Sequence, residues 1–136
     1  MTDFPIPPIL HQTWHTKIFH PEWKSQFNIM YQQNPHITFK IYDDTDCRNF
    51  ISQHFNKQVL WAFDTLNTGA YKADLFRYCV LYIEGGIYFD IKLVSNDLDY
   101  FRKREIFLVR DIQNYSDMTN NCTYSDYYSQ SYTQIK

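Results

Sequence analysis

The chain is poor in the residues that break regular structure and in those that crosslink a polypeptide. Its 136 residues include only three glycines and five prolines, and no apolar run approaches the roughly eighteen residues of a membrane-spanning helix. The three widely spaced cysteines do not make a disulfide framework or a zinc site, and we interpret them as reduced core thiols. A net charge of −2 leaves no broad basic surface for nucleic acid. These absences argue against a disordered, disulfide-rich, membrane-spanning or nucleic-acid-binding protein.

The first residues, Met-Thr-Asp-Phe-Pro, carry no basic segment followed by an apolar stretch. We therefore expect neither a signal peptide nor a membrane anchor in this chain, and a cytoplasmic location by default. The chain does contain 19% aromatic residues and enough length for one domain with a real core. We place this domain at residues 1–112. Residues 113–136 are rich in Tyr, Ser and Asn, and predict a polar tail with the composition of a disordered segment.

The stretch from Thr68 to Val94 predicts a helix, a glycine turn and a strand. Thr68 is a good helix N-cap, and apolar residues cover most of the circumference of the following helix, so we expect that helix to be buried on more than one side. Gly85-Gly86 allows the positive φ that ends a helix. Ile87–Val94 has the apolar and alternating pattern of a buried strand.

Three charged residues stand out in this apolar stretch. Asp74 and Arg77 are three residues apart and so lie on one helix face, and Asp90 is the one acid in the strand pattern. A carboxylate at the end of a central strand, close to a buried acid and an arginine, is costly unless a ligand or cation uses it. Asp74, Arg77 and Asp90 are therefore the candidate functional residues.

A short strand is predicted at Ile9–Trp14. In a parallel sheet the first strand ends at the ligand crevice, where His11, Gln12, Thr13 and Trp14 would offer polar groups and an aromatic face to a nucleobase and a ribose. The alternative is that Trp14 belongs to the core and that His11 hydrogen-bonds a backbone group. The residues by themselves favour this alternative.

The remaining segments complete an α/β order. Residues 21–34 predict a helix that begins with a proline, and residues 36–42 alternate like a second strand. The acidic cluster at 43–46 is interpreted as the cap of the next helix, and another short helix at 59–66 follows. Such an order fits one mainly parallel sheet with helices on its faces, which binds nucleotides at the carboxyl ends of its strands. One more strand is predicted at 106–109.

Two segments carry a resemblance to a known family. They are Gly-Ala-Tyr-Lys-Ala-Asp-Leu-Phe-Arg-Tyr at 69–78 and Leu-Tyr-Ile-Glu-Gly-Gly-Ile-Tyr-Phe-Asp at 81–90. Together with Pro-x-x-Leu-His-Gln-Thr-Trp at 7–14, they resemble the sugar-nucleotide glycosyltransferases that contain the DXD motif. More narrowly, they resemble the family of the initiating α-1,6-mannosyltransferases of yeast and the inositol-phosphoceramide mannosyltransferases. The resemblance covers about residues 6–94.

The resemblance implies a GT-A-like (Rossmann-like) α/β fold that binds a nucleotide-sugar donor. After about residue 94 the chain looks truncated or divergent, because the C-terminal half that supplies the family's acceptor site is not recognisable. Carried onto this sequence, Asp74 and Arg77 would grip the hydroxyls and phosphate of the donor, and Asp90 would be the first Asp of the DXD motif. The segment His11–Trp14 would line the nucleotide pocket, and Tyr88 would join the donor-binding residues.

Lys92 departs from the family pattern, because it stands where the DXD motif has its second Asp. An ammonium group cannot coordinate Mg²⁺ or Mn²⁺, although it can itself offset the charge of a diphosphate. Whether Asp90 holds a metal is therefore left open. Strand alternation would place Lys92 on the same side as Asp90, so a neighbouring ion pair on a polar face is the alternative interpretation.

Three functions remain. The resemblance implies a retaining glycosyltransferase that moves mannose, glucose or galactose from a UDP- or GDP-hexose to a glycan or lipid acceptor. The second hypothesis is a degenerate relative that binds a sugar nucleotide, or only a partner protein, without turnover. The third is a metal-binding or hydrolytic domain built on His11, His15, His20 and Glu22, and it is weak because His11 and His15 would not share a face in a strand and loop.

Overall fold

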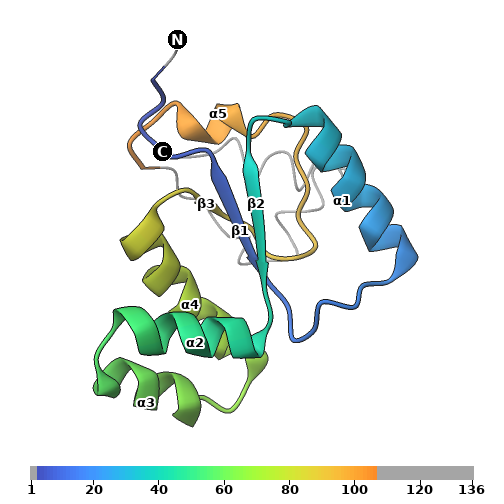
Figure 1. Cartoon of the computed structure of the whole chain (residues 1–136). Coiled ribbons are helices and arrows are strands. Elements are labelled where there is room, and N and C mark those ends of the chain that lie inside the picture. Colours follow the sequence, from blue (N-terminus) through green and yellow to red (C-terminus); the bar gives the residue numbers. More distant parts are fainter. Residues whose placement is uncertain (1–2, 107–136) are drawn as a thin grey trace, which may run out of the picture. The chain divides into compact units, whose positions relative to one another are not determined.

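Three short parallel strands form the sheet of the computed structural model, which describes residues 3–106. The strands are β1 (Ile9–Thr13), β2 (Thr38–Tyr42) and β3 (Ile87–Tyr88). Their order in the sheet is β2-β1-β3, so β1 is central, with Ile9 opposite Thr38 and Leu10 opposite Ile87. Helices surround the strands (Figure 1). This arrangement confirms the predicted GT-A-like α/β class.

The residues of β1 alternate between the two faces of the sheet. Leu10 and Gln12 lie on one face, and His11 and Thr13 lie on the other. Leu10, His11 and Gln12 are all buried, so both faces of the central strand are covered. A strand covered on both sides need not alternate between apolar and polar residues, which explains its mixed sequence.

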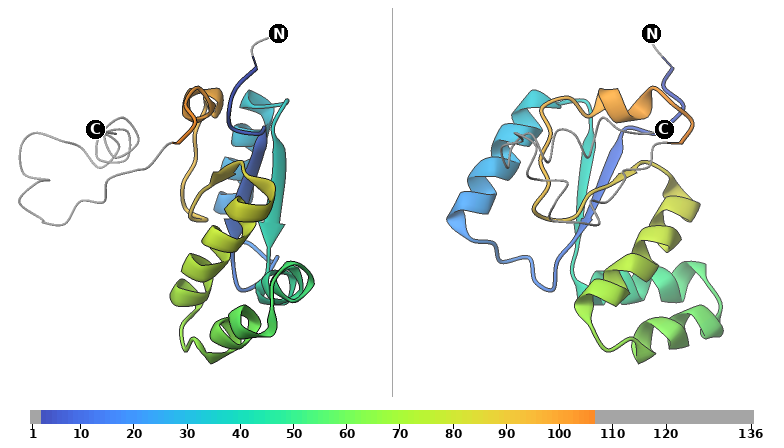
Figure 2. Two further views of the ribbon diagram at one scale, coloured as in Figure 1. Left: turned by 90° about the vertical axis from the view of Figure 1, so that its left-hand side faces the viewer. Right: turned by 180° about the vertical axis from the view of Figure 1, so that it is seen from behind.

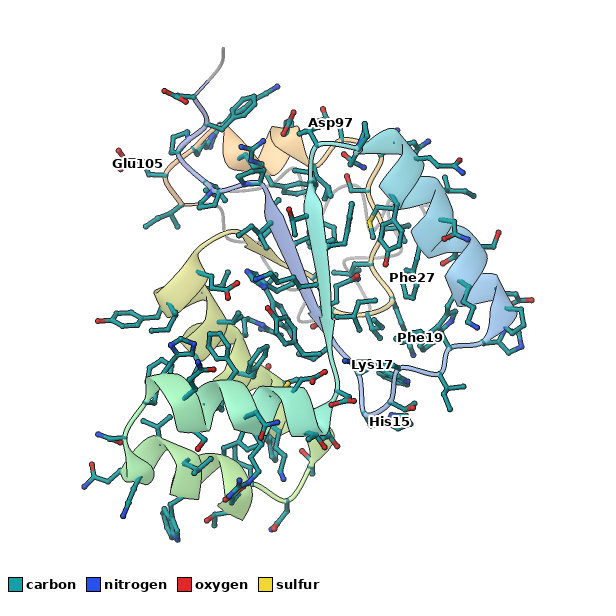
Figure 3. All side chains as sticks on the ribbon, in the orientation of Figure 1. His15, Lys17, Phe19, Phe27, Asp97 and Glu105 are labelled. Carbon is teal, nitrogen blue, oxygen red and sulfur yellow. The ribbon has the colours of Figure 1, made fainter. Side chains whose placement is uncertain are left out.

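The first helix, α1 (Pro21–Gln33), runs along the β2 edge of the sheet (Figure 1). Pro21 suits its start because the first N–H groups of a helix need no intrahelical partner. Phe27 and Met30 are its buried residues, and the ring of Phe27 meets Phe19 edge-on at 5.4 Å (Figure 3). The prediction of this helix is confirmed.

Asn34 ends α1 and also fixes a distant loop. Its buried Nδ2 donates to the carbonyl of Ser95 at 3.1 Å, and its Oδ1 accepts the N–H of Leu98 at 2.9 Å. The loop therefore enters α5 (Asp99–Arg102) from a position set by the end of α1.

Two further helices, α2 (Asp44–His54) and α3 (Lys57–Thr65), pack with α4 beyond the carboxyl end of β2 (Figure 1). Asp43 caps α2, because its Oδ1 accepts the N–H of Asp46 at 2.9 Å while Asp46 Oδ2 accepts the N–H of Asp43 at 3.1 Å. The capping interpretation of the acidic cluster is confirmed. α3 begins earlier than predicted because the side chain of Asn56 caps it.

α4 (Gly69–Glu84) begins at Thr68, whose Oγ1 accepts the N–H of Tyr71 at 3.2 Å. Its buried residues join one core with residues of α2 and α3; these are Phe76, Cys79 and Val80 of α4, Cys47, Phe50 and Ile51 of α2, and Phe63 of α3. Both cysteines in this core are free thiols, as predicted.

The expectation that α4 is buried on more than one side is wrong. Tyr71, Tyr78 and Tyr82 lie on one face of α4 and are 58%, 72% and 82% exposed. The neighbouring helices pack against the opposite side, and a tyrosine tolerates exposure because water can bind its hydroxyl group.

β3 ends at Tyr88, so the predicted strand through Val94 is also wrong. After Phe89 the N–H of Leu93 donates to the carbonyl of Asp90 at 2.9 Å, which closes a turn and stops the strand. β3 is moreover an edge strand of the described sheet and not a central one. Figure 2 shows the segment after β3 crossing the sheet toward α5. Burial of Phe89 in this segment, rather than pairing, accounts for its apolar sequence.

Of the strand predicted at 106–109 only the first residue is described, and the predicted tail at 113–136 lies outside the described residues. Within residues 3–106, the helices are too short or too polar to cross a bilayer.

Candidate functional site

Arg77 lies between the two candidate carboxylates. Its Nη2 is 3.2 Å from Oδ1 of Asp74 and 3.2 Å from Oδ1 of Asp90. Asp74 reaches it from one helical turn earlier in α4, and Asp90 reaches it because the turn after α4 and β3 returns the chain past the helix. The structure thus brings together the three residues singled out from the sequence.

The ring of Tyr88 lies beneath Arg77 in this cluster. The guanidinium carbon of Arg77 lies 4.8 Å from the centre of the Tyr88 ring, a cation–π distance. The hydroxyl of Tyr88 is 2.7 Å from Oγ1 of Thr13, at the carboxyl end of the neighbouring strand. Burial raises the pKa of Tyr88, although the Thr13 hydrogen bond and the charge of Arg77 act in the opposite direction. The stack links α4, β3 and β1.

The charged groups of the cluster are open to a ligand. The side chains of Asp74 and Asp90 are 56% and 68% exposed, and that of Arg77 is 35% exposed. Nε of Arg77 is buried and has no hydrogen-bond partner among the described residues. The exposed part of the guanidinium, next to two exposed carboxylates, can bind an anion together with neighbouring hydroxyl groups.

His11 is fully buried and both of its ring nitrogens are used. Nε2 is 2.9 Å from the carbonyl of Gly85, and Nδ1 is 3.0 Å from the hydroxyl of Tyr42. Burial lowers the pKa of His11, and Lys40 acts in the same direction, against the backbone bond and Glu84. The structure therefore shows the backbone hydrogen bond of the alternative interpretation.

Gln12 and Trp14 lie on either side of Thr13 at the end of β1. Gln12 is 1% exposed, and neither Nε2 nor Oε1 of its side chain has a hydrogen-bond partner among the described residues. Trp14 is half-buried, and its ring lies 5.1 Å from that of Trp23, edge to face. The partly open indole is a group on which a nucleobase could stack, whereas the carboxamide of Gln12 is buried.

Lys92 is exposed in the turn after Phe89 and makes no salt bridge within the described part of the chain. Because β3 has already ended, strand alternation does not apply to Asp90 and Lys92, and the predicted ion pair between them is absent from the described contacts. Asp90 pairs with Arg77 instead.

The proposed histidine metal cluster does not assemble. Residues 3–106 contain no group of three or more His, Cys, Asp or Glu side chains placed to hold a metal ion. His15 lies in the loop after β1 (Figure 3), and Nδ1 of His20 accepts the N–H of Glu22 at the start of α1. With His11 buried elsewhere, these residues have separate local roles.

Sequence reasoning missed Tyr42, which holds His11 in the interior and whose pKa is raised by burial. It also missed the ion pair of Lys40 with Glu84, at 2.8 Å beside His11. The available signal was the alternation of β2, which places Lys40 and Tyr42 on one face, opposite His11 and Thr13 in the register.

The part of the chain that contains this cluster matches a known protein family. Residues 20–97 match the family described as "Glycosyltransferase sugar-binding region containing DXD motif". This range contains Asp74, Arg77, Tyr88, Asp90 and Lys92, whereas β1 precedes it. No solved structure matches the chain.

Several curated proteins are similar to the chain over about two thirds of its length. Inositol phosphoceramide mannosyltransferase 2 of Schizosaccharomyces pombe is 35% identical over 86 residues, which cover 63% of the chain and 25% of the relative. Uncharacterized glycosyltransferase L373 of Acanthamoeba polyphaga mimivirus is 32% identical over 91 residues, covering 65% and 36%. Initiation-specific alpha-1,6-mannosyltransferase of Candida albicans is 31% identical over 98 residues, covering 67% and 25%. The chain thus spans only about a quarter to a third of the length of these relatives.

Proposed function

Because the chain belongs to the family of glycosyltransferase sugar-binding regions containing the DXD motif, we propose that it binds a nucleotide-sugar donor and transfers its hexose to a glycan or lipid acceptor. The donor would be a UDP- or GDP-hexose carrying mannose, glucose or galactose. The single observation that carries the proposal is the Asp74–Arg77–Asp90 cluster, stacked on Tyr88 at the carboxyl end of the sheet. Parallel α/β sheets bind nucleotides at the carboxyl ends of their strands.

Each side chain of the cluster has a chemical task in this proposal. Transfer breaks the bond between the anomeric carbon and the diphosphate oxygen, so negative charge develops on the leaving group. Arg77 would offset that charge, with Lys92 as a second cation. Asp74 and Asp90 would orient sugar hydroxyls by accepting their hydrogen bonds. The acceptor oxygen forms the new bond to the anomeric carbon on the face that the diphosphate leaves, and its proton passes to the departing diphosphate oxygen.

The nucleoside half of the donor would lie along the end of β1. Trp14 offers a partly exposed ring on which a base can stack. Thr13, next to it, hydrogen-bonds the hydroxyl of Tyr88. Gln12 has a donor and an acceptor without partners among the described residues, but it is 1% exposed and so lies beneath this surface. His11 contributes from behind this surface, because its ring is buried.

A divalent metal, Mn²⁺ or Mg²⁺, is the usual expectation for a DXD motif, and the residues present do not fit it well. These ions prefer oxygen ligands. Asp90 already pairs with Arg77, and the neighbouring ligand position holds Lys92, which has no lone pair when charged. We therefore derive no step of the proposed reaction through a metal.

A second candidate is a sugar-nucleotide-binding or interaction domain of the same fold that does not catalyse transfer. The observation that favours it is Lys92 in the place of the second Asp. Binding without turnover would still use Arg77 and Asp90.

A thermal unfolding panel separates these candidates. UDP-glucose, UDP-galactose, GDP-mannose, UDP and GDP are each added with and without Mn²⁺, because a ligand at a hundredfold excess over its Kd stabilises the folded state by about 2.7 kcal/mol. We expect a shift with one base only, which Arg77→Ala removes and Arg48→Ala retains, since Arg48 forms a similar ion pair with Asp64 between α2 and α3. Hydrolysis or transfer of the shifting donor then distinguishes an enzyme from a binding domain. No shift with any nucleotide would contradict donor binding, and with it the transferase, and would leave only the interaction domain.

A further inference from the structure

We infer that His11 is a positioning residue that fixes the Gly85–Gly86 turn and, through it, holds Tyr88 and Asp90 opposite Arg77. The inference rests on the proposed function in one respect only, namely that this cluster binds a nucleotide diphosphate. The geometric part of the inference concerns the turn itself and can be tested without any ligand.

The hydrogen bonds and the burial of His11 together indicate its protonation state. The carbonyl of Gly85 can only accept, so Nε2 carries a proton. Burial lowers the pKa of His11 and so favours the neutral ring, in which Nδ1 accepts the hydroxyl of Tyr42. The ring is neutral and joins β1 to β2 on one side and to the end of α4 on the other. With both nitrogens occupied and no exposed surface, it has no free group for a substrate.

The glycine turn is built against this ring. Gly85 and Gly86 both have positive φ, of 65° and 93°. A Cβ added to Gly86 would come within 2.6 Å of the carbonyl oxygen of Ile9 and 3.2 Å of His11 Nε2. The turn therefore lies directly on β1, at the residue that also hydrogen-bonds it. Its position is fixed in part by the hydrogen bond between His11 Nε2 and the Gly85 carbonyl, beside the contacts with Ile9 and Pro7.

The same strand holds the residues after the turn. His11 is opposite Tyr88 in the register, and its carbonyl accepts the N–H of Phe89 at 3.0 Å. His11 thus holds the turn with its side chain and the exit of β3 with its backbone. Asp90 follows immediately, and its carboxylate reaches Arg77. A displaced turn would move Tyr88 from beneath the guanidinium, so Arg77 would lose the ring that orients it. It would also release Arg77 from Asp90, but that gain is at most a few-fold and smaller than the loss.

Affinity for the diphosphate should fall, because a site whose residues are displaced by about an ångström loses much of its binding or catalytic power. In the whole chain, His11→Leu should weaken GDP or UDP binding, whichever the wild type binds, by roughly tenfold. His11→Gln should keep it within about twofold, because the glutamine amide can still donate to the Gly85 carbonyl. Val80→Ala is the matched control, since it removes buried side-chain volume from the core of α4 without touching the turn.

Amide hydrogen exchange gives a readout that needs no nucleotide. We expect His11→Leu to speed exchange at the N–H of Phe89 more than at the core amides of α2, and Val80→Ala to show the reverse. If His11→Leu does not fold, His11→Asn takes its place against His11→Gln, because asparagine is too short to reach Gly85.

Equal losses of affinity in Val80→Ala and the His11 variant, or unchanged Phe89 exchange in that variant, would overturn the inference. A wild-type chain that binds no nucleotide would instead overturn the proposed function, and the exchange measurement would still decide the role of His11.

Discussion

Arg77 and Asp90 are 13 residues apart in sequence, yet Nη2 of the arginine lies 3.2 Å from Oδ1 of the aspartate. The same nitrogen is 3.2 Å from Asp74. One cation is thus shared by two carboxylates. An incoming diphosphate must compete with Asp90 for Arg77, so removing the charge of Asp90 should change the affinity of the site for an anion.

We predict that Asp90→Asn strengthens binding of inorganic pyrophosphate in the absence of metal. The substitution releases Arg77 from an exposed ion pair, and such pairs contribute about 0.2–1 kcal/mol, so the gain in affinity should be at most a few-fold. Isothermal titration calorimetry at low salt measures it. Asp44→Asn, at an exposed position in the first turn of α2, is the control and should change the affinity little. Weaker binding in Asp90→Asn would contradict the competition between the two anions.

Lys92→Asp should make donor binding depend on Mn²⁺. The substitution supplies a second carboxylate close to Asp90, and it removes a positive charge that repels a divalent ion. The measurement is the thermal shift caused by the preferred nucleotide with and without Mn²⁺, compared between the wild type and the variant. Lys24→Asp makes the same change of charge on an exposed part of α1 and should leave the Mn²⁺ response unaltered. An equal response in both variants would show that net charge, not metal ligation, is responsible.

Gly86→Ala should destabilise the fold by about 1–3 kcal/mol or more, since the added methyl group would collide with the backbone of β1 at a positive φ. Gly69→Ala is the matched substitution, because nothing lies within 4 Å of its added Cβ at the first residue of α4. It should be neutral or stabilising by up to about 1 kcal/mol. Urea unfolding of both variants measures the difference, and a similar change in both would contradict the close packing of the turn.

The buried His11 should make stability fall as the pH falls. Its pKa is lowered from the ordinary value of 6.5 in the folded state, mainly by burial, so below that value the unfolded chain binds the proton more readily. The contribution of His11 is complete above pH 6.5 and is lost as the pH falls toward its folded pKa. Glu84 and the Gly85 carbonyl oppose this shift and Lys40 supports it, while Tyr42 is neutral throughout.

The measurement for this prediction is the midpoint of urea unfolding between pH 7 and pH 5. The decrease should be smaller in His11→Gln than in the wild type. His54→Gln, at the exposed end of α2, should retain the wild-type decrease. An identical pH dependence in the wild type and His11→Gln would contradict the prediction.

Local signals in the sequence were sufficient for most helices and for the pairing of Asp74 with Arg77. Thr68, Asp43 and the Gly85–Gly86 pair act on their own neighbours, and their effects appear in the structure as expected. The spacing of Asp74 and Arg77 is likewise a property of any helix.

The errors came from burial patterns, which depend on distant partners. The sequence after Gly86 looks like a long strand because the segment is apolar, but a turn at Asp90 buries those residues without pairing them. The tyrosines of α4 look like core residues because no local signal tells which face the other helices cover. The roles of Tyr42 and Lys40 depended on the register of β2 with β1, which the sequence of either strand alone does not contain.

The two hydrogen bonds that Asn34 makes with the loop before α5 limit how far the residues after Phe89 can move. On one side the loop is pinned where Phe89 donates to His11, and on the other where Ser95 meets Asn34. Only residues 90–94 lie between these two hydrogen bonds, so Asp90 and Lys92 belong to a short segment that is held at both ends. Such a span cannot move clear of the sheet without first breaking one of these two hydrogen bonds.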